Sequence, residues 1–379
     1  MSEFRFPHRI AALRSVLSQN SRPDTDDAVD GMIVSYLEHG KYLTGFTGSN
    51  ALVIITKDHA LFLTDGRYDL QSSTEVPGFD RVILPPASDL ALAAAQKVAA
   101  LGIKRAGFET THLTYAAYNS LAKNMAEIAP AVQLIGRTNV VEFIKAIKDA
   151  DEIAALRVAI DAADEAFTHL QQIVKPGMSE LDVAWELESF LRRVKGATRL
   201  GFDSIIGSGP NSAMIHGRPT ERILGSSGGS EFLLCDYGCE INGYNSDLTR
   251  TFVVNGEPTA RQREIYDVVK AAQLAALEAI KPGVIGKDVD AAARNIITAA
   301  GFGNNFNHGL GHGLGRLVHD QYGVFNATSE LVIREGMVVT VEPGIYLDGW
   351  GGVRIEDDVL VTATGYEVLT HSTKEMVIL

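Results

Sequence analysis

The chain has 379 residues, of which 46% are hydrophobic and 21% are charged, and its formal net charge is −13. This length and composition are typical of a protein with two globular domains. The acidic balance argues against nucleic acid and anionic membranes as partners, because both require a basic surface. The sequence also has no apolar run of the ~18 residues that a membrane span needs.

The N-terminal sequence and the cysteines indicate a cytoplasmic protein. Residues 1–10 lack the uninterrupted apolar core of a signal peptide. The two cysteines are Cys235 and Cys239, and if both lie on one strand their Cα atoms are ~13 Å apart. This distance is too long for a disulfide, so we expect two reduced cysteines that face the core.

Residues 1–145 are predicted to form a small α/β domain. One helix is indicated over residues 89–101, with Ser88 as its N-cap and Gly102 as its stop, and a second over residues 115–128. Runs rich in apolar and β-branched residues predict four strands: residues 32–35, 51–56, 60–64 and 81–84.

A second domain is predicted over residues 146–379, and it begins with a long amphipathic helix. Apolar residues recur at spacings of three and four from Ile153 to Val174, and Lys175-Pro-Gly177 ends the helix. The sequence around this stop returns 106 residues later, at Lys281-Pro-Gly283. Because each copy follows one helix, opens another and precedes sheet-like sequence, we predict an internal duplication.

Two aspartates are expected on the arms of one β-hairpin. Asn242-Gly243 between two apolar runs is a strong signal for a two-residue turn. In that register Asp247 faces Gly238, and Asp236 lies on the same face, ~7–8 Å from Asp247 at Cα. The two carboxylates then converge on one cation pair, and Gly238 leaves room for the metal. The alternative is a pair of solvated strand aspartates beside a turn.

Three histidines lie in or near a glycine-rich run at residues 308–315, namely His308, His312 and His319. Glycine at alternate positions disfavours a helix there and allows the backbone to approach other groups closely. We expect one of these histidines to bind metal and the others to support it or to contact substrate. The alternative for any one of them is an ordinary polar residue with satisfied hydrogen bonds.

Two glutamates complete the set of candidate ligands. Glu342 follows the apolar strand of residues 337–341, where a carboxylate is costly unless it is paired or bound to metal. Glu356 shares a strand face with Arg354 and Asp358, a pattern that a salt-bridged strand surface would explain nearly as well. Four carboxylates and one imidazole in one cavity need two divalent cations to neutralise them. This oxygen-rich set suits Mn²⁺, Co²⁺, Fe²⁺ or Zn²⁺.

The motifs, taken in order, resemble those of the pita-bread metallopeptidases, the family of aminopeptidase P, prolidase and methionine aminopeptidase. Residues 1–145 resemble the creatinase-type N-terminal domain of its Xaa-Pro branch. The resemblance implies an α/β N-terminal domain followed by an α+β pita-bread catalytic domain with an internal pseudo-twofold repeat. It is carried by Asp236-Tyr-Gly238, Ser246-Asp-Leu-Thr-Arg-Thr251, His308-Gly-Leu-Gly-His-Gly-Leu-Gly315, Val341-Glu-Pro-Gly344 and Val353-Arg-Ile-Glu-Asp-Asp358.

The resemblance also implies two divalent metal ions, with Mn²⁺ as the expected metal. Asp236 and Glu342 would each bind one ion, Asp247 and Glu356 would bridge both, and His312 would be the lone imidazole ligand. Glu342 would also carry a proton to the leaving nitrogen.

Further residues around the metal ions receive roles from the same resemblance. His216 and His319 match histidines on the substrate side, and we count both among the catalytic and the substrate-binding residues. His308 matches a supporting position that we include among the substrate-binding residues. Arg354 matches an arginine close to the metal cluster, and we count it among the catalytic residues.

The activity implied is hydrolysis of the peptide bond between an N-terminal residue and proline by an Xaa-Pro aminopeptidase acting on proline-containing peptides, with a homodimer as the expected assembly. An Xaa-Pro dipeptidase is the alternative. The two activities differ in whether a residue blocks the space beyond proline or captures its carboxylate, and no such residue is identifiable from the sequence. A creatinase is disfavoured by the ligand set, and a methionine aminopeptidase by the extra domain. A non-catalytic binding protein is a remote alternative, since all five ligand positions are present.

Overall fold

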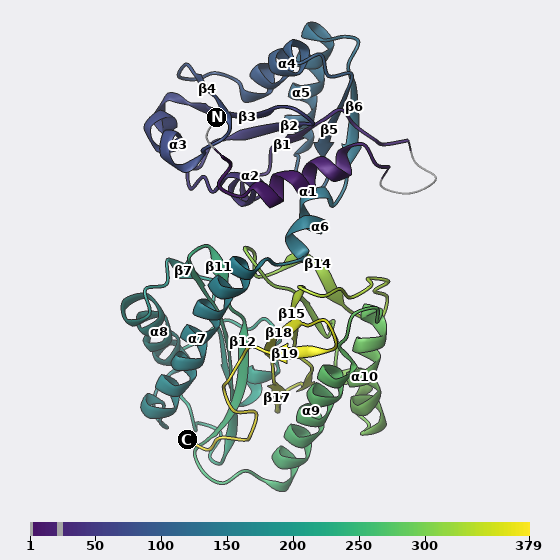
Figure 1. Ribbon diagram of the computed structural model, residues 1–379. Helices are drawn as coiled ribbons and strands as arrows, with labels where there is room; N and C mark the ends of the chain where they lie inside the picture. The colour runs from purple at the N-terminus through teal and green to yellow at the C-terminus, as the bar shows by residue number, and fades with distance from the viewer. Residues whose placement is uncertain (1–2, 21–25) are drawn as a thin grey trace. The chain divides into compact units, whose positions relative to one another are not determined.

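The computed structural model describes residues 3–20 and 26–379, so Met1 and Ser2, the first two positions of the segment examined for a signal peptide, lie outside the described residues. The chain divides into two compact units, Met1–Lys145 and Ala146–Leu379 (Figure 1). Each unit is described by itself below.

The first unit is built on a six-stranded mixed sheet with the strand order β4-β3-β2-β1-β5-β6. Strand β2 runs antiparallel to both of its neighbours, whereas the β1–β5, β5–β6 and β3–β4 pairs are parallel. The strands are β1 (Gly31–Val34), β2 (Leu52–Thr56), β3 (Ala60–Asp65), β4 (Asp80–Leu84), β5 (Arg105–Glu109) and β6 (Gln133–Arg137).

Helices cover both faces of this sheet. Because successive strand residues point to opposite faces, Met32 packs with α1 and α2, whereas the adjacent Ile33 packs with α4 and α5. The result is an apolar layer on each side of the sheet. The helices are α1 (Pro7–Leu17), α2 (Leu37–Thr44), α3 (Asp69–Glu75), α4 (Leu90–Ala100), α5 (Tyr115–Ile128) and α6 (Val140–Ala146), with a 3₁₀ turn at Gly66–Tyr68.

The predicted elements of this unit are confirmed within one or two residues, and α5 has the predicted bounds. The predicted N-cap of α4 is wrong: Asp89, not Ser88, caps the helix, because its carboxylate accepts a hydrogen bond of 2.8 Å from the amide of Ala91. The sequence reasoning missed β5 and β6, which contain a glycine and end in charged residues.

In the second unit, Figure 1 shows α7 and α8 along one side of the strands and α9 and α10 along the other. The predicted long helix is confirmed as α7, which Asp149 and Glu152 begin with reciprocal capping hydrogen bonds. The helices are α7 (Ala150–Ile173), α8 (Glu180–Ser189), which continues as a π-helical turn at Phe190–Val194, α9 (Ala260–Ala279) and α10 (Gly286–Ala299), with 3₁₀ turns at Gly209–Ala213 and Gly303–Asn305.

Two antiparallel sets of strands in the second unit are similar, and each packs against its own helix pair. They are the sheet β8-β9-β12 and the strands β13-β15-β18 within the sheet β14-β13-β15-β18-β19. The first half contains β7 (Arg199–Leu200), β8 (Ile205–Ser208), β9 (Glu231–Tyr237), β10 (Cys239–Ile241), β11 (Tyr244–Asn245) and β12 (Leu248–Val254). The second half contains β13 (Gly311–Gly313), β14 (Asp320–Phe325), β15 (Val338–Val341), β16 (Gly344–Leu347), β17 (Gly351–Arg354), β18 (Asp357–Val361) and β19 (Tyr366–Val368).

Backbone hydrogen bonds confirm the internal repeat. The amide of Gly177 donates to the carbonyl of Leu224, and 106 residues later the amide of Gly283 donates to the carbonyl of Ile333. Isolated β-bridges follow the same period, at Ser179 in the first half and at Ile285 in the second. The duplicated Lys-Pro-Gly segments therefore begin equivalent helices in two equivalent settings.

The hairpin register is confirmed, but our explanation for its glycine is wrong. Asn242 and Gly243 both have positive φ, and Tyr244 pairs with Ile241, so Asp247 lies opposite Gly238 as predicted. A Cβ at Gly238 would lie 1.9 Å from the carbonyl oxygen of Ser246. The glycine therefore makes room for the backbone of the opposite arm and not for a metal ion.

Replacing Gly238 with alanine is expected to destabilise the protein by about 1–3 kcal/mol, because the new methyl group forces the two arms apart. Urea unfolding of the variant measures this loss. Gly229→Ala is the matched control, since nothing lies within 4 Å of a Cβ at that position. Equal stability of the two variants would contradict the close approach of the arms.

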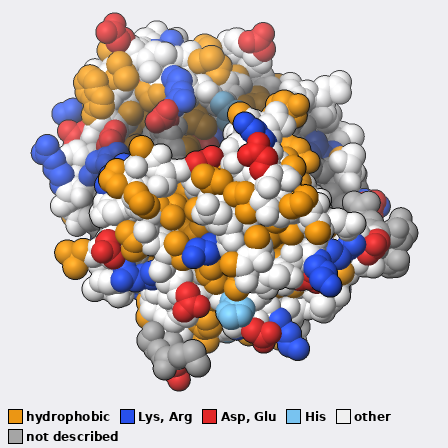
Figure 2. Space-filling view, turned by 90° about the horizontal axis from the view of Figure 1, so that it is seen from above, with side chains coloured by type: hydrophobic (Ala, Val, Ile, Leu, Met, Phe, Trp, Pro, Cys, Tyr) orange, Lys and Arg blue, Asp and Glu red, His pale blue; other side chains and the backbone are white. Residues whose placement is uncertain are grey.

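The prediction of two reduced cysteines that face the core is confirmed. Cys235 and Cys239 are buried and not joined by a disulfide. Among the described residues, no helix has the length and apolar character needed to cross a membrane. On the face shown in Figure 2, acidic, basic and apolar side chains are interspersed.

Candidate metal centre

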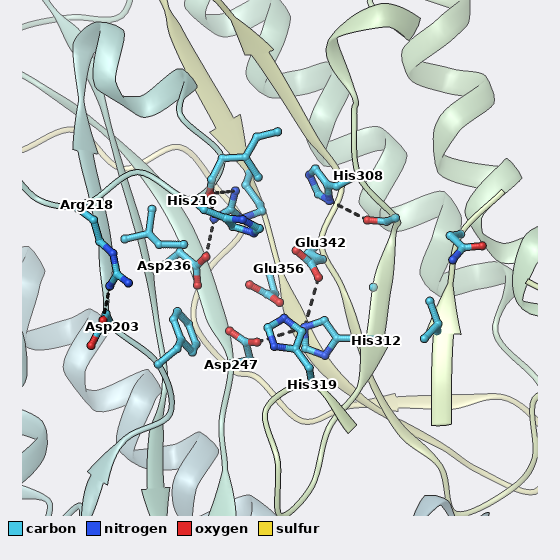
Figure 3. Close-up of a pocket in the computed structure, with 18 residues that line it drawn as sticks. Asp203, His216, Arg218, Asp236, Asp247, His308, His312, His319, Glu342 and Glu356 are labelled. Atoms are coloured by element: carbon cyan, nitrogen blue, oxygen red, sulfur yellow. Dashed lines mark hydrogen bonds and ion pairs between the residues drawn. The ribbon is translucent and has the colours of Figure 1, made fainter. Parts of the chain in front are cut away.

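The five predicted metal ligands lie together in the lining of one cavity of about 510 Å³ (Figure 3). They come from both halves of the duplicated unit, and each lies in or next to a strand. Asp236 lies in β9 and Glu342 directly follows β15, and the two are also 106 residues apart. They therefore occupy equivalent positions in the two halves. The set is Asp236, Asp247, His312, Glu342 and Glu356.

Hydrogen bonds donated by backbone amides hold the carboxylate-bearing residues across the junction of the two halves. The amide of Asp247 donates to Asp358 Oδ2 at 3.1 Å, and the amide of Glu356 donates to the carbonyl of Thr249 at 3.1 Å. Each bond joins a residue of the first half to one of the second. The positions of the two side chains relative to each other therefore depend on the docking of the halves.

His312 presents one ring nitrogen to the carboxylates. Its Nδ1 lies 3.1 Å from the carbonyl oxygen of Gly313, to which it donates in the neutral form. Nε2 then carries the lone pair and lies 3.4 Å from Asp247 Oδ2 and 3.5 Å from Glu342 Oε1. A lone pair that faces two acceptors is unfavourable unless a cation lies between them, and a backbone carbonyl on the other nitrogen is typical of a metal-binding histidine.

When no cation is bound, the charged forms of these acidic groups are disfavoured. Burial raises the pKa of Asp247 and of Glu356 well above the usual carboxyl range, and the charges of neighbouring carboxylates add to the shift. Burial also raises the pKa of Glu342. Asp236 Oδ1 is buried and has no hydrogen-bond partner among the described residues. An orphaned oxygen in a cluster of acids is what a site for divalent cations requires.

Arg354 is buried beside this cluster, with 2% of its surface exposed. Its Nη2 lies 2.5 Å from Asp236 Oδ2, its Nη1 donates to the hydroxyl of Tyr346 at 2.7 Å, and its Nε donates to Thr249 Oγ1 at 3.1 Å. The alternative of a salt-bridged strand surface is wrong for Arg354 and Asp358. Both are buried, and they lie on β17 and β18, which belong to different sheets.

The three remaining histidines also line the cavity. His308 Nδ1 lies 2.7 Å from the carbonyl of Gly309 and Nε2 lies 2.9 Å from the hydroxyl of Tyr346, and burial lowers the pKa of His308 to about 3. Desolvation lowers the pKa of His319 to about 4, and its ring centroid lies 4.3 Å from that of His312. His216 is exposed. His308 and His319 are therefore neutral at physiological pH.

Sequence reasoning missed three hydroxyl groups that orient the site. Thr249 Oγ1 donates to Glu356 Oε2 at 2.6 Å, and Thr340 Oγ1 accepts from the amide of His312 and lies 3.3 Å from Glu342 Oε1. The third is the hydroxyl of Tyr346, between His308 and Arg354. A threonine inside an otherwise apolar buried strand, as in Val338-Val-Thr-Val341, is the signal that could have identified Thr340.

Thr249→Val is expected to weaken metal binding and kcat/KM by about 10–100-fold, because it frees both Glu356 and Arg354 from one shared hydroxyl. Metal titration and peptide hydrolysis measure the two effects. Thr251→Val is the matched control on the same strand, since the Thr251 hydroxyl bonds only backbone atoms of Arg354 in the hydrogen bonds described. Equal losses in both variants would mean that Thr249 supports the fold and not the site.

Comparisons with known proteins identify the families to which the two parts of the chain are similar. Residues 154–363 match Metallopeptidase family M24, and residues 9–145 match the Creatinase/Prolidase N-terminal domain. The uncharacterized peptidase YqhT of Bacillus subtilis is 41% identical over 351 residues, which are 93% of this chain and 96% of that protein.

Two solved structures are similar over nearly the whole chain. An Xaa-Pro dipeptidase from Bacillus anthracis is 39% identical, with a TM-score of 0.89 over 98% of this chain and 99% of its own. An X-Pro aminopeptidase from Thermotoga maritima is 30% identical, with a TM-score of 0.83 over 93% of this chain and 98% of its own. The chain therefore belongs to metallopeptidase family M24, with a creatinase/prolidase N-terminal domain ahead of a pita-bread catalytic domain.

Proposed function

We propose that this protein is a dinuclear metal-dependent Xaa-Pro dipeptidase. The observation that carries the proposal is the convergence of four carboxylates and one imidazole lone pair on a single cavity, with an orphaned oxygen on Asp236. Membership of family M24 implies a dinuclear metal site, and Mn²⁺ is the metal that we propose for this oxygen-rich set. Because all five candidate ligands are present together, a non-catalytic binding protein remains the remote alternative.

A bound metal pair supplies a Lewis acid and water of lowered pKa for attack on the peptide carbonyl. Glu342, whose pKa burial raises, is suited to take up a proton and pass it to the leaving nitrogen of proline. His319 is neutral, so its ring N–H is available to the carbonyl oxygen on which negative charge develops. His216 is proposed as a second contact to the substrate at the exposed side of the cavity.

Arg354 and His308 support this chemistry by fixing the positions of neighbouring side chains. The guanidinium of Arg354 neutralises Asp236 and fixes the hydroxyl of Tyr346, which in turn donates to His308 Nε2. Burial raises the pKa of Tyr346 to about 12, so the phenol keeps its proton. We propose that this series of hydrogen bonds keeps one wall of the cavity rigid beside the substrate.

The preference for a dipeptide has two supports. The Xaa-Pro dipeptidase of Bacillus anthracis is more similar to this chain than the X-Pro aminopeptidase of Thermotoga maritima, so the named relatives favour the dipeptidase alternative over our leading prediction of an aminopeptidase. In addition, Arg218 lines the cavity and is paired with Asp203 at 2.5 Å. Both side chains are exposed, and an exposed ion pair is weak, so Arg218 can exchange Asp203 for the carboxylate of a dipeptide.

A peptide-length series tests this function. We expect Ala-Pro to be hydrolysed faster than Ala-Pro-Ala, and Arg218→Met to lower kcat/KM for Ala-Pro by about 10–100-fold, since a hydrogen bond to a charged group contributes about 1.5–3 kcal/mol. Ala-Pro-amide, which lacks the carboxylate, should show no such loss. Arg199→Met is the control, because Arg199 is also an exposed arginine paired with a carboxylate but does not line the cavity.

The alternatives give different results in the same series. Faster hydrolysis of Ala-Pro-Ala than of Ala-Pro, with no effect of Arg218→Met, would favour the Xaa-Pro aminopeptidase. No hydrolysis of any peptide after reconstitution with Mn²⁺, Co²⁺ or Zn²⁺ would favour the binding protein.

A further inference from the structure

A second group of metal-binding side chains lies in the first unit of the chain, outside the catalytic cavity. His39 is on α2, His112 is in the loop between β5 and α5, and Glu142 is on α6. One donor atom from each of these three residues lies within 4.8 Å of the other two. We call this group the His39 cluster.

The ring of His39 is held in an orientation suited to a metal ligand. Its Nδ1 lies 2.5 Å from Glu109 Oε1, while Glu109 Oε2 accepts from the amides of Ser35 and Tyr36 at 2.7 and 2.8 Å. Because two backbone donors hold Glu109 as an acceptor, the proton of His39 belongs on Nδ1. A carboxylate on the far nitrogen of a ligating histidine is the usual support of a metal site.

The other nitrogen of His39 is the observation that points to a ligand. His39 is fully buried, and its Nε2 has no hydrogen-bond partner among the described residues. With the proton on Nδ1, Nε2 carries the lone pair and is the nitrogen of His39 that remains for a ligand. If both nitrogens were protonated, Nε2 would instead be a buried donor without an acceptor, so a neutral ring that binds a cation is the favourable state.

His112 and Glu142 complete the cluster from the other side. His112 Nε2 lies 3.0 Å from Glu142 Oε1, and the ring of Tyr36 stacks on that of His112 with centroids 3.8 Å apart. The rings of His39 and His112 are perpendicular, with centroids 4.9 Å apart. Side chains from three separate segments therefore converge in a fixed arrangement.

The charge and the donor types of the His39 cluster fit a divalent cation, and we choose Zn²⁺. Glu109 and Glu142 are both buried, so two carboxylates face two imidazoles in a region that a dication would neutralise. Two imidazoles and one carboxylate form the ligand type of Zn²⁺, in contrast to the single imidazole of the catalytic cavity. In a tetrahedral Zn²⁺ site donors lie about 3.4 Å apart, so the cluster would contract slightly on binding.

We propose that His39, His112 and Glu142 bind one Zn²⁺ ion, with Glu109 as the carboxylate that positions His39. His112 is only partly buried, so it gives the ion a route of entry and leaves space for water as the fourth ligand. The ion would join α2, the loop after β5 and α6. None of these residues lines the catalytic cavity, so this ion would be separate from the proposed metal pair.

Metal analysis of the full-length protein tests the site. We expect His112→Phe, which keeps a ring against Tyr36 but removes the donor, to bind one Zn²⁺ ion fewer per chain than wild type after saturation and gel filtration. Glu142→Gln is a second variant that should lose the same ion, and His59→Phe, at an exposed position of the same unit, should lose none. The readout is a difference of one ion, so it does not depend on how the catalytic cavity is filled or on the proposed activity.

A measurement on the unmodified protein makes the test independent of variant folding. Crystals grown with Zn²⁺ should give an anomalous difference peak at the zinc edge between His39 Nε2 and the Glu142 carboxylate. Equal zinc content in wild type and both variants, or no anomalous peak at the cluster, would overturn the proposal and leave the rings as aromatic packing alone.

Discussion

Asp247→Asn is expected to lower kcat/KM for an Xaa-Pro peptide by at least about 10³-fold, which corresponds to about 4 kcal/mol, and to stabilise the metal-free protein at the same time. The carboxylate is buried, lies 3.4 Å from His312 and shares the cavity with Asp236, Glu342 and Glu356. Asparagine keeps the shape of the side chain but removes its charge. It therefore removes a proposed metal ligand and also relieves repulsion that is present without metal.

The expected gain in stability of the metal-free variant follows from the raised pKa of Asp247. Burial, followed by the charges of Asp236, Asp358 and Glu342, raises the pKa of Asp247 well above its usual value of 3.8. Between the usual and the raised pKa, the folded state holds a proton that the unfolded state has lost, so the stability of the metal-free protein falls as the pH rises through this window. Asp247→Asn should make that fall shallower.

Urea unfolding from pH 4 to pH 8, with chelator and with Mn²⁺, measures the effect. Saturating Mn²⁺ should remove most of the decline in wild type, because the cations compensate the buried charges. Asp267→Asn is the control at an exposed position of α9 and should change neither activity nor slope. A metal-free Asp247→Asn protein that is less stable than wild type at neutral pH would contradict the assignment.

Arg354→Met is expected to destabilise the metal-free protein by about 3–5 kcal/mol, the usual result of removing one partner of a buried ion pair. Asp236 would keep a buried charge without its guanidinium, and the Tyr346 hydroxyl and Thr249 Oγ1 would each lose a donor. Arg354→Lys should recover only part of the loss, because an ammonium group cannot reach three acceptors in a fixed plane.

Divalent metal distinguishes a role in the site from a general role in folding. If cations sit beside Asp236, saturating Mn²⁺ should reduce the loss caused by Arg354→Met, because the ions replace the missing positive charge. Arg222→Met is the matched control, since Arg222 pairs with the buried Glu231 and does not line the cavity. Its loss should not depend on metal, and the same insensitivity in Arg354→Met would place Asp236 away from any cation.

Much of the fold was predictable because it depends on local signals. The Asn242-Gly243 turn set the register that brings Asp247 opposite Gly238, and the repeated Lys-Pro-Gly segments marked the duplication. The five residues of the proposed metal site were predicted from short motifs, with four carboxylates in strand-like sequence and one histidine in a glycine-rich run. Each of these signals is contained in a few neighbouring positions.

The remaining features depend on contacts between distant segments. The role of Thr249 arises because a residue 107 positions later, Glu356, lies against it, and no local pattern contains that pairing. The run at residues 353–358 reads as one alternating strand, but it leaves one sheet and enters another because Glu356 bonds the opposite half. Asp358 was read as a surface charge for the same reason, although its carboxylate accepts from the amide of Asp247.

The equivalence of Asp236 and Glu342 has an evolutionary consequence. A half-length ancestor that paired with itself about a twofold axis would already have placed one acid from each copy at the contact. Such a homodimer is symmetric, so it cannot alter one side of its pocket without altering the other. A single chain that contains both halves is free of that constraint, and the strand registers place Gly207 of β8 at the position that corresponds to His312 of β13. The difference between the two halves of the cavity is therefore one that a symmetric homodimer could not have acquired.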